Sequence, residues 1–206
     1  AIVFTSGISY TVSSGASVQV ATVPEVVTVT TLADTVDATD NLLSLREAIT
    51  AANATSSSEF IVFDSSLFTG GPGIITLAGS ALPTIANNGL LGIAGPGSAT
   101  LTINGDNGDL SRNFNIFNIS SSADFTVSGA TISGAQTTGN GGAFNSNAGI
   151  LTVTDAIITN NFANEGAGIY GNSGTLTVSN SSITGNTSAS TTPMTIAASM
   201  ISSAIR

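Results

Sequence analysis

A short motif that returns every 24 to 26 residues constrains this chain more than any other feature. In each copy a large apolar residue, a threonine and a β-branched residue follow one another, and the copies begin at Leu101, Phe125, Leu151 and Leu176. A repeat of this length is typical of a solenoid, in which successive turns of the chain stack. The period-two alternation predicts strands with the apolar side chains inward and the threonines outward.

A second apolar position follows the last three copies at a constant distance. Ile132, Ile158 and Ile183 each lie five residues after the preceding valine, and segments 141–144 and 166–169 match one period apart. Glycine and asparagine in the connections supply the positive φ angles that sharp corners need. These patterns together predict an all-β fold, a right-handed parallel β-helix.

The side chains of the four copies are expected to stack in columns, with about 4.8 Å between turns. The two inward columns are Leu101, Phe125, Leu151 and Leu176, and Ile103, Val127, Val153 and Val178. The outward column is Thr102, Thr126, Thr152 and Thr177. Such a hydroxyl ladder resembles those of ice-binding β-helices, whereas exposed threonine more often serves strand propensity and solubility.

One helix is expected before the first repeats. Ser44-Leu-Arg46-Glu47 has the spacing of a capping box, in which Ser44 and Glu47 satisfy each other's backbone amides. The apolar residues that follow fall on one face of a helix over 44–53. A short amphipathic helix of this kind is suited to cover the open end of a β-helix, since stacked repeats need capped ends.

Four segments are expected along the chain. Residues 1–25 read as a strand-like extension, and 26–70 as a cap that contains the helix. Residues 71–190 are the β-helix proper, and 191–206 form a C-terminal tail or a second cap.

The charge balance excludes several kinds of partner. The net charge is −9, and the 206 residues include no Lys, His or Cys. Such a surface repels phosphate backbones and anionic lipids, so neither nucleic acid nor a membrane surface is an expected partner. The sequence contains no run of 18 apolar residues, so no membrane span is expected. The chain starts at Ala1 on a strand-like run, as after removal of a signal peptide, which favours an extracellular or cell-surface location.

One loop offers candidate glycan contacts. Asp106, Asp109 and Arg112 lie close together in a segment rich in glycine and asparagine. Two carboxyl groups that face each other across a bond are the requirement for glycoside hydrolysis. A solvated turn with a surface ion pair is the simpler interpretation of the same residues.

A second acidic group precedes the helix. Asp34, Asp37 and Asp40 are spaced by three residues, and clustered oxygen ligands of this kind can hold Ca²⁺. Aspartate is also favoured in turns and near helix N-termini, and the spacing differs from that of an EF-hand. We therefore expect no cofactor, with calcium at Asp34 to Asp40 as the alternative.

The segments 27–34, 43–49 and 52–53 resemble the CSLREA domain of secreted and surface proteins, and the Gly-Gly-Ala-Phe144 repeat is similar to repeats of polymorphic outer-membrane proteins. The similarity covers roughly residues 26 to 190. Leu43 stands where the family usually has cysteine, which favours an apolar packing role there. The resemblance implies a β-helix outside the cell or on its surface, and it implies no established reaction and no catalytic residues.

The leading functional hypothesis is a non-enzymatic extracellular protein with a structural or adhesive role. It would self-associate through its apolar terminal segments into a filament or surface assembly, and the simplest joint is a strand from residues 1–23 added to the sheet edge of a neighbour. The alternative is a protein that binds or cleaves carbohydrate, with surface glycans as partners.

Overall fold

The computed structural model describes residues 24–86, 89–106, 113–190 and 202–203. Most of the expected extension at 1–25 and most of the tail at 191–206 lie outside these ranges. The described chain is mainly strands, with one α-helix and one 3₁₀ helix. Neither helix is long and apolar enough to cross a membrane.

Short strands follow one another along most of the described chain, and both helices lie near its start. In chain order the elements are β1 (Glu25–Val29), α1 (Leu45–Asn53), β2 (Glu59–Phe63), η1 (Ser65–Phe68), β3 (Gly73–Thr76), β4 (Leu90–Ala94), β5 (Leu101–Asn104), β6 (Phe117–Ile119), β7 (Asp124–Ser128), β8 (Thr131–Ser133), β9 (Phe144–Ser146), β10 (Ile150–Thr154), β11 (Ile157–Thr159), β12 (Phe162–Ala163), β13 (Ile169–Gly171), β14 (Thr175–Ser179), β15 (Ser182–Thr184), β16 (Thr187–Ser188) and β17 (Ser202–Ser203).

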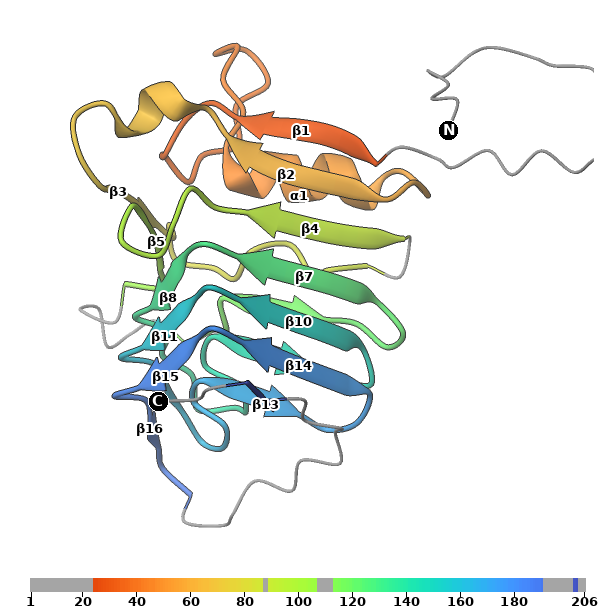
Figure 1. Ribbon diagram of the computed structural model, residues 1–206, viewed down its shortest axis with the longest axis vertical. Helices are drawn as coiled ribbons and strands as arrows, with labels where there is room; N and C mark the ends of the chain where they lie inside the picture. Colours follow the sequence, from red (N-terminus) through yellow and green to blue (C-terminus); the bar gives the residue numbers. More distant parts are fainter. Residues whose placement is uncertain (1–23, 87–88, 107–112, 191–201, 204–206) are drawn as a thin grey trace, which may run out of the picture.

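The strands form four parallel sheets. Sheet 1 has the order β1-β2-β4-β7-β10-β14-β17, and sheet 2 has the order β15-β11-β8-β5-β3. Sheet 3 is β13-β9-β6, and sheet 4 is β12-β16. Successive turns of the chain add neighbouring strands, so the strands of sheet 1 lie one above another along the molecule (Figure 1). The all-β, parallel part of the prediction is confirmed.

Most of the predicted register is confirmed as well. Leu151 pairs with Phe125 on one side and with Leu176 on the other. In sheet 2, Ile158 pairs in the same way with Ile132 and Ile183. These inward side chains stack because each turn buries its apolar face against the turns above and below.

The place predicted for Leu101 is wrong. Leu101 lies on β5 in sheet 2, where the next apolar position, Ile103, pairs with Ile132. The position beside Phe125 in sheet 1 belongs to Leu91, which lies 34 residues earlier rather than 24. The turn between β4 and β7 is therefore longer than the later turns, in which paired positions are 25 or 26 residues apart.

The corners of the chain use left-handed backbone conformations at repeating places. Gly129, Asp155 and Asn180 each follow a strand of sheet 1, with φ of 61°, 52° and 48°. After the strands of sheet 2, the same region is occupied at Gly134 and Asn160. Asn, Asp and Gly reach this region at low cost, which is why they recur there.

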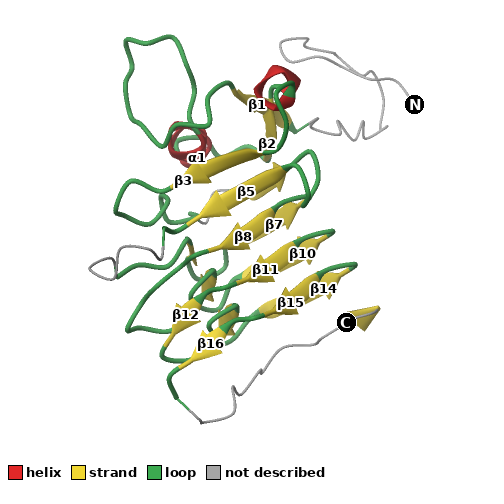
Figure 2. Ribbon diagram, turned by 90° about the vertical axis from the view of Figure 1, so that its left-hand side faces the viewer, coloured by secondary structure: helices red, strands yellow, loops and turns green. Residues whose placement is uncertain are grey.

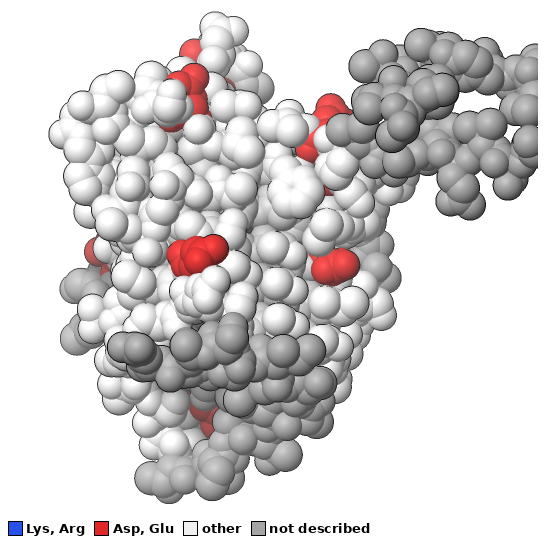
Figure 3. Space-filling view, viewed as in Figure 1, with Lys and Arg blue, Asp and Glu red and all other residues white. Residues whose placement is uncertain are grey.

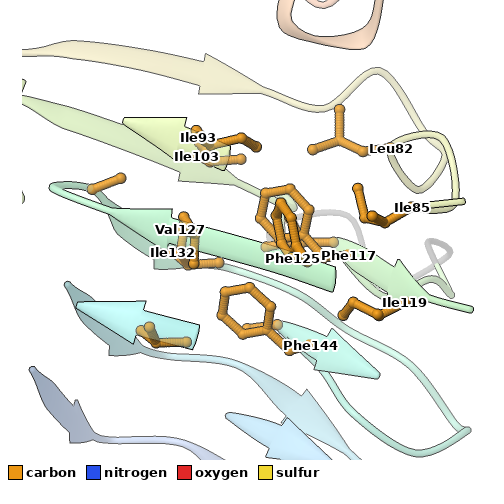
Figure 4. Close-up of a cluster of buried hydrophobic side chains, with 14 of the residues drawn as sticks. Leu82, Ile85, Ile93, Ile103, Phe117, Ile119, Phe125, Val127, Ile132 and Phe144 are labelled. Carbon is orange, nitrogen blue, oxygen red and sulfur yellow. The ribbon is translucent and has the colours of Figure 1, made fainter. Parts of the chain in front are cut away.

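The core lies between the sheets and contains a stack of aromatic rings. Phe117, Phe125 and Phe144 are fully buried and point toward one another from sheets 3 and 1 (Figure 4). The ring of Phe117 is stacked on that of Phe144, with centroids 5.2 Å apart, and lies 5.3 Å from that of Phe125. Packed rings of this size supply much of the apolar burial of the middle turns.

Helix α1 closes the N-terminal end of the core. Its capping box is present: the Ser44 side chain accepts from the amide of Glu47, and Glu47 accepts from the amide of Ser44. Its stripe of Leu45, Ala48, Ile49 and Ala52 is buried, and Leu43 packs against the same core. The helix lies above β3, the end strand of sheet 2 (Figure 2).

Candidate functional site

Arg46 and Asp34 form an ion pair that serves the fold. The guanidinium donates to both carboxylate oxygens of Asp34, with Nε–Oδ1 of 2.9 Å and Nη2–Oδ2 of 2.8 Å. It also donates to the carbonyls of Ala81 and Ser80, while Asp34 Oδ2 accepts from the amide of Ala78. The Asp34 side chain is 1% exposed. The predicted capping residue Arg46 thus joins α1 to the segment after β3.

The other two predicted calcium ligands have local partners. Asp37 Oδ1 accepts from the hydroxyl and the amide of Thr39, which holds the pKa of Asp37 below its ordinary value. Asp40 accepts from the amide of Leu42 at 2.8 Å. The described ranges contain no group of three His, Cys, Asp or Glu side chains placed to hold a metal ion. The structure therefore does not gather Asp34, Asp37 and Asp40 as calcium ligands.

Of the predicted glycan contacts, one falls within the described residues. Asp106 has a left-handed backbone with φ of 58°, and its amide donates to Asn104 Oδ1 at 2.7 Å. Asp109 and Arg112 lie outside the described residues. Their role as glycan contacts therefore stays a prediction.

The outward hydroxyl column is shorter than expected. Thr126, Thr152 and Thr177 lie side by side on β7, β10 and β14. Thr102 is in sheet 2, and the corresponding place on β4 is Gly92. A ladder of three threonines gives little area for a lattice-matched ligand such as ice.

A better candidate site is a shallow groove of about 410 Å³ beside sheet 3. We call it the amide groove, because five of its eight lining residues are asparagines. It is lined by Thr138, Gly139, Asn140, Asn145, Asn147, Asn164, Tyr170 and Asn172. These residues come from β9, β13 and the loops around them, in two successive turns of the chain.

Amide ladders along the stack position the asparagines. Asn172 donates to Asn147 Oδ1 at 3.2 Å, and Asn164 donates to Asn140 Oδ1 at 3.4 Å. Asn145 donates in the same way to Asn118 on β6. A primary amide has two N–H donors and two lone pairs on its oxygen. A ladder bond uses one donor of the first residue and one lone pair of the second, so capacity for further hydrogen bonds remains.

Tyr170 adds an aromatic ring to the groove. It lies on β13 in register with Asn145 of β9, and its residue is partly exposed. A tyrosine ring offers an apolar face together with a polar hydroxyl. The groove therefore combines amides that donate and accept hydrogen bonds with one surface that excludes water.

The groove suits a neutral ligand that carries hydroxyl groups. The described residues that line it include no carboxylate, imidazole, thiol or cation. Among the described residues Arg46 is the one Lys or Arg side chain, and it is committed to Asp34. The face in Figure 3 likewise shows scattered carboxylates and no basic residue among its described atoms. Among the described lining residues an anionic ligand would find no opposite charge, whereas sugar hydroxyl groups can bond to the amides.

Sequence reasoning assigned this region only to corners and missed the groove. The available signal was asparagine at matching places in successive repeats, as in Asn147 and Asn172 or Asn118 and Asn145. Asparagine is common in turns for conformational reasons, and this explanation hid the shared surface.

No protein-family model matches this chain, and the searches of curated proteins and of solved structures also found no match.

Proposed function

We propose that this chain is a right-handed parallel β-helix that acts outside the cell or on its surface as a non-enzymatic adhesive protein, with the amide groove as its binding site for neutral glycans. The parallel sheets with neighbours one turn apart support the β-helix, and crossover connections between parallel strands are almost always right-handed. The resemblance to CSLREA-domain proteins supports the extracellular location.

The amide groove is the observation that carries the proposal. Sugar hydroxyls both donate and accept hydrogen bonds, and the aligned amides of Asn145, Asn147 and Asn172 offer both functions on a rigid scaffold. Tyr170 offers a ring for the apolar face of a sugar. The described lining has no carboxyl, imidazole or amino group, the usual general acids and bases, which favours binding without turnover.

The proposal is tested by probing an array of neutral and acidic glycans with the whole chain. We expect binding to neutral glycans, and a loss of about tenfold or more in Asn145→Ala and Tyr170→Ala, since each removes one or two contacts. Asn41→Gly is the matched control, because Asn41 is an exposed asparagine in another loop with φ of 58°, which glycine tolerates. Binding of wild-type strength in both groove variants would refute the site.

Self-association is a second candidate function, favoured by the N-terminal end of sheet 1. On the outer face of sheet 1, one column of side chains contains Thr126 and Thr152 in the later strands. At the N-terminal end, on β2 and β1, the same column contains Phe60 and Val26. Val26 is 61% exposed. An apolar outer face next to an end strand is a feature of surfaces that another chain covers.

The outer edge of β1 has backbone groups that bond to no other strand among the described residues. The amide of Glu25 and the carbonyl of Val29 are bonded on the β2 side. Because alternate residues of a parallel strand bond to the same neighbour, the backbone groups of Val26 and Thr28 face the open edge. Beyond them Thr30 is bonded to Leu43, so this edge is short. We extend the proposal to a terminal joint at which a second copy pairs with β1.

A proline substitution tests this joint. Thr28→Pro removes an edge amide and leaves the β1–β2 ladder intact, so we expect the chain to shift from oligomer to monomer in light scattering coupled to size exclusion. Thr28→Ser keeps the amide and is the control. A wild-type chain that stays monomeric at every concentration would exclude the joint and leave the glycan site unaffected.

A further inference from the structure

A second groove lies on another face of the molecule, where sheet 2 meets sheet 4. It has a volume of about 480 Å³, and its lining includes Asn104, Ser133, Asn160, Phe162 and Thr187. In Figure 2 the strands that carry Phe162 and Thr187, β12 and β16, lie beside β11 and β15. We call it the Phe162 groove.

Phe162 is an exposed aromatic residue in polar surroundings. Phe162 is 38% exposed, while Phe117, Phe125 and Phe144 are fully buried. Two backbone bonds tie it to the preceding turn, because its amide donates to the carbonyl of Ala135 at 2.8 Å and its carbonyl accepts from the amide of Thr137 at 3.1 Å. An exposed aromatic ring gains free energy when an apolar surface of a ligand covers it.

Polar residues precede and follow Phe162 along the stack. Phe162 is in register with Gln136 in the preceding turn and with Thr187 in the next. The side chain of Asn104 lies against Gly134, and a Cβ atom added at Gly134 would collide with the Oδ1 atom of Asn104. Gly134, with φ of 72°, therefore leaves room for the Asn104 side chain, which a larger residue would displace into the groove.

We propose that the Phe162 groove is a second saccharide site, in which the apolar face of a pyranose ring stacks on Phe162. The C–H groups of one sugar face are apolar and gain from burial against the ring, while the hydroxyls at the sugar's rim meet amide and hydroxyl groups. The inference extends the proposed glycan-binding function to a second face, so that one molecule engages two glycan chains. Two sites on one rigid scaffold raise avidity without new contacts.

The test follows backbone amide shifts of the ¹⁵N-labelled chain during titration with neutral tetrasaccharides of glucose, N-acetylglucosamine and xylose. We expect two separate groups of shifts, one at Phe162 and Thr187 and the other at Asn147 and Asn172. Phe162→Ala should weaken the first group about tenfold and leave the second unchanged, while Phe162→Trp should keep both. Ile150→Ala is the matched control, because Ile150 is 42% exposed on the outer face of sheet 1.

The outcomes separate the two proposals. Shifts confined to the amide groove would overturn the second site and leave the proposed function standing. Shifts at Phe162 alone would support the second site and overturn the first. Equal losses in Phe162→Ala and Ile150→Ala would overturn the stacking, and no shifts with any of the three sugars would overturn both sites.

Discussion

Arg46 shows how one side chain can hold a distant loop to a helix. It pairs with Asp34 and donates to the carbonyls of Ser80 and Ala81, which lie 34 and 35 residues along the chain. Lysine would keep the charge but could not form the planar two-bond contact with a carboxylate.

Removal of this side chain should be costly. Arg46→Ala leaves the nearly buried carboxylate of Asp34 without its counter-charge, and we expect a loss of about 3 to 5 kcal/mol in the free energy of unfolding. Urea denaturation measures it, with Arg46→Lys expected in between. A loss below about 1 kcal/mol in Arg46→Ala would show that water compensates the carboxylate.

Glu47 makes the helix cap sensitive to acid. The amides of Ser44 and Asp37 donate to its two oxygens, and these bonds hold the pKa of Glu47 below its ordinary value of 4.5. The Glu47 carboxylate thus binds a proton more weakly in the folded state than in the unfolded state. Its stabilising contribution is therefore present above pH 4.5 and is lost as the pH falls through the lower, folded-state pKa.

The Glu47→Gln variant should separate this effect from general acid unfolding. Glutamine has one accepting oxygen instead of two, so we expect about 1 kcal/mol less stability at about pH 7. The difference from wild type should shrink as the pH falls below 4.5, because protonation makes the glutamate side chain neutral as well. Urea titrations at neutral and acidic pH check this, and a difference independent of pH would contradict the assigned cause.

At the scale of an element, the corner after sheet 2 depends on a buried asparagine. Asn161 is 1% exposed, accepts from the amide of Ala135 and donates to the carbonyl of Ile132 and to Asn186. It thus replaces backbone hydrogen bonds where the chain turns. Buried amides and carbonyls without such a partner would be unpaired.

Truncation of an asparagine side chain at this corner should lower the free energy of unfolding more where the side chain is more deeply buried. We expect Asn161→Ala to lower the free energy of unfolding by about 2 to 3 kcal/mol, since two buried backbone groups lose partners. Asn186→Ala, at the same place one turn later but less buried, should cost less. Thermal and urea denaturation of both variants gives the comparison, and equal effects would argue against burial as the cause.

Strands and helix followed from the sequence where side-chain chemistry was specific. The β-branched alternation around Leu151 and the capping box at Ser44 each had one reasonable structure. Leu101 was misplaced because Leu-Thr-Ile fits an inward column of either sheet, and a longer turn before β7 broke the period. The amide groove depends on which asparagines face outward together, and local spacing alone did not determine that.

At the scale of the molecule, stability comes from contacts between neighbouring turns. Phe117 joins two turns through Phe144 and meets sheet 1 through Phe125. In stacked repeats the loss of one such contact weakens the turns on both sides, because each turn relies on its neighbours.

Replacement of this central ring tests that dependence. Phe117→Ala should reduce the free energy of unfolding by about 3 to 5 kcal/mol, the range for truncation of a buried aromatic residue. Phe162→Ala is the control, because its ring is partly in water and should cost far less. Calorimetry of the two variants measures the difference, and similar melting temperatures would contradict the stacking account.

The direction of the hydrogen bonds in sheet 1 has a mechanical consequence. Its strands lie across the stack and their ladders run along it, so a pull applied between the two ends loads each ladder in tension. Strands should then peel away singly from an end, and each turn of 25 residues would release up to about 80 to 90 Å of chain. An adhesive tether with this design would extend in steps and dissipate energy at each one.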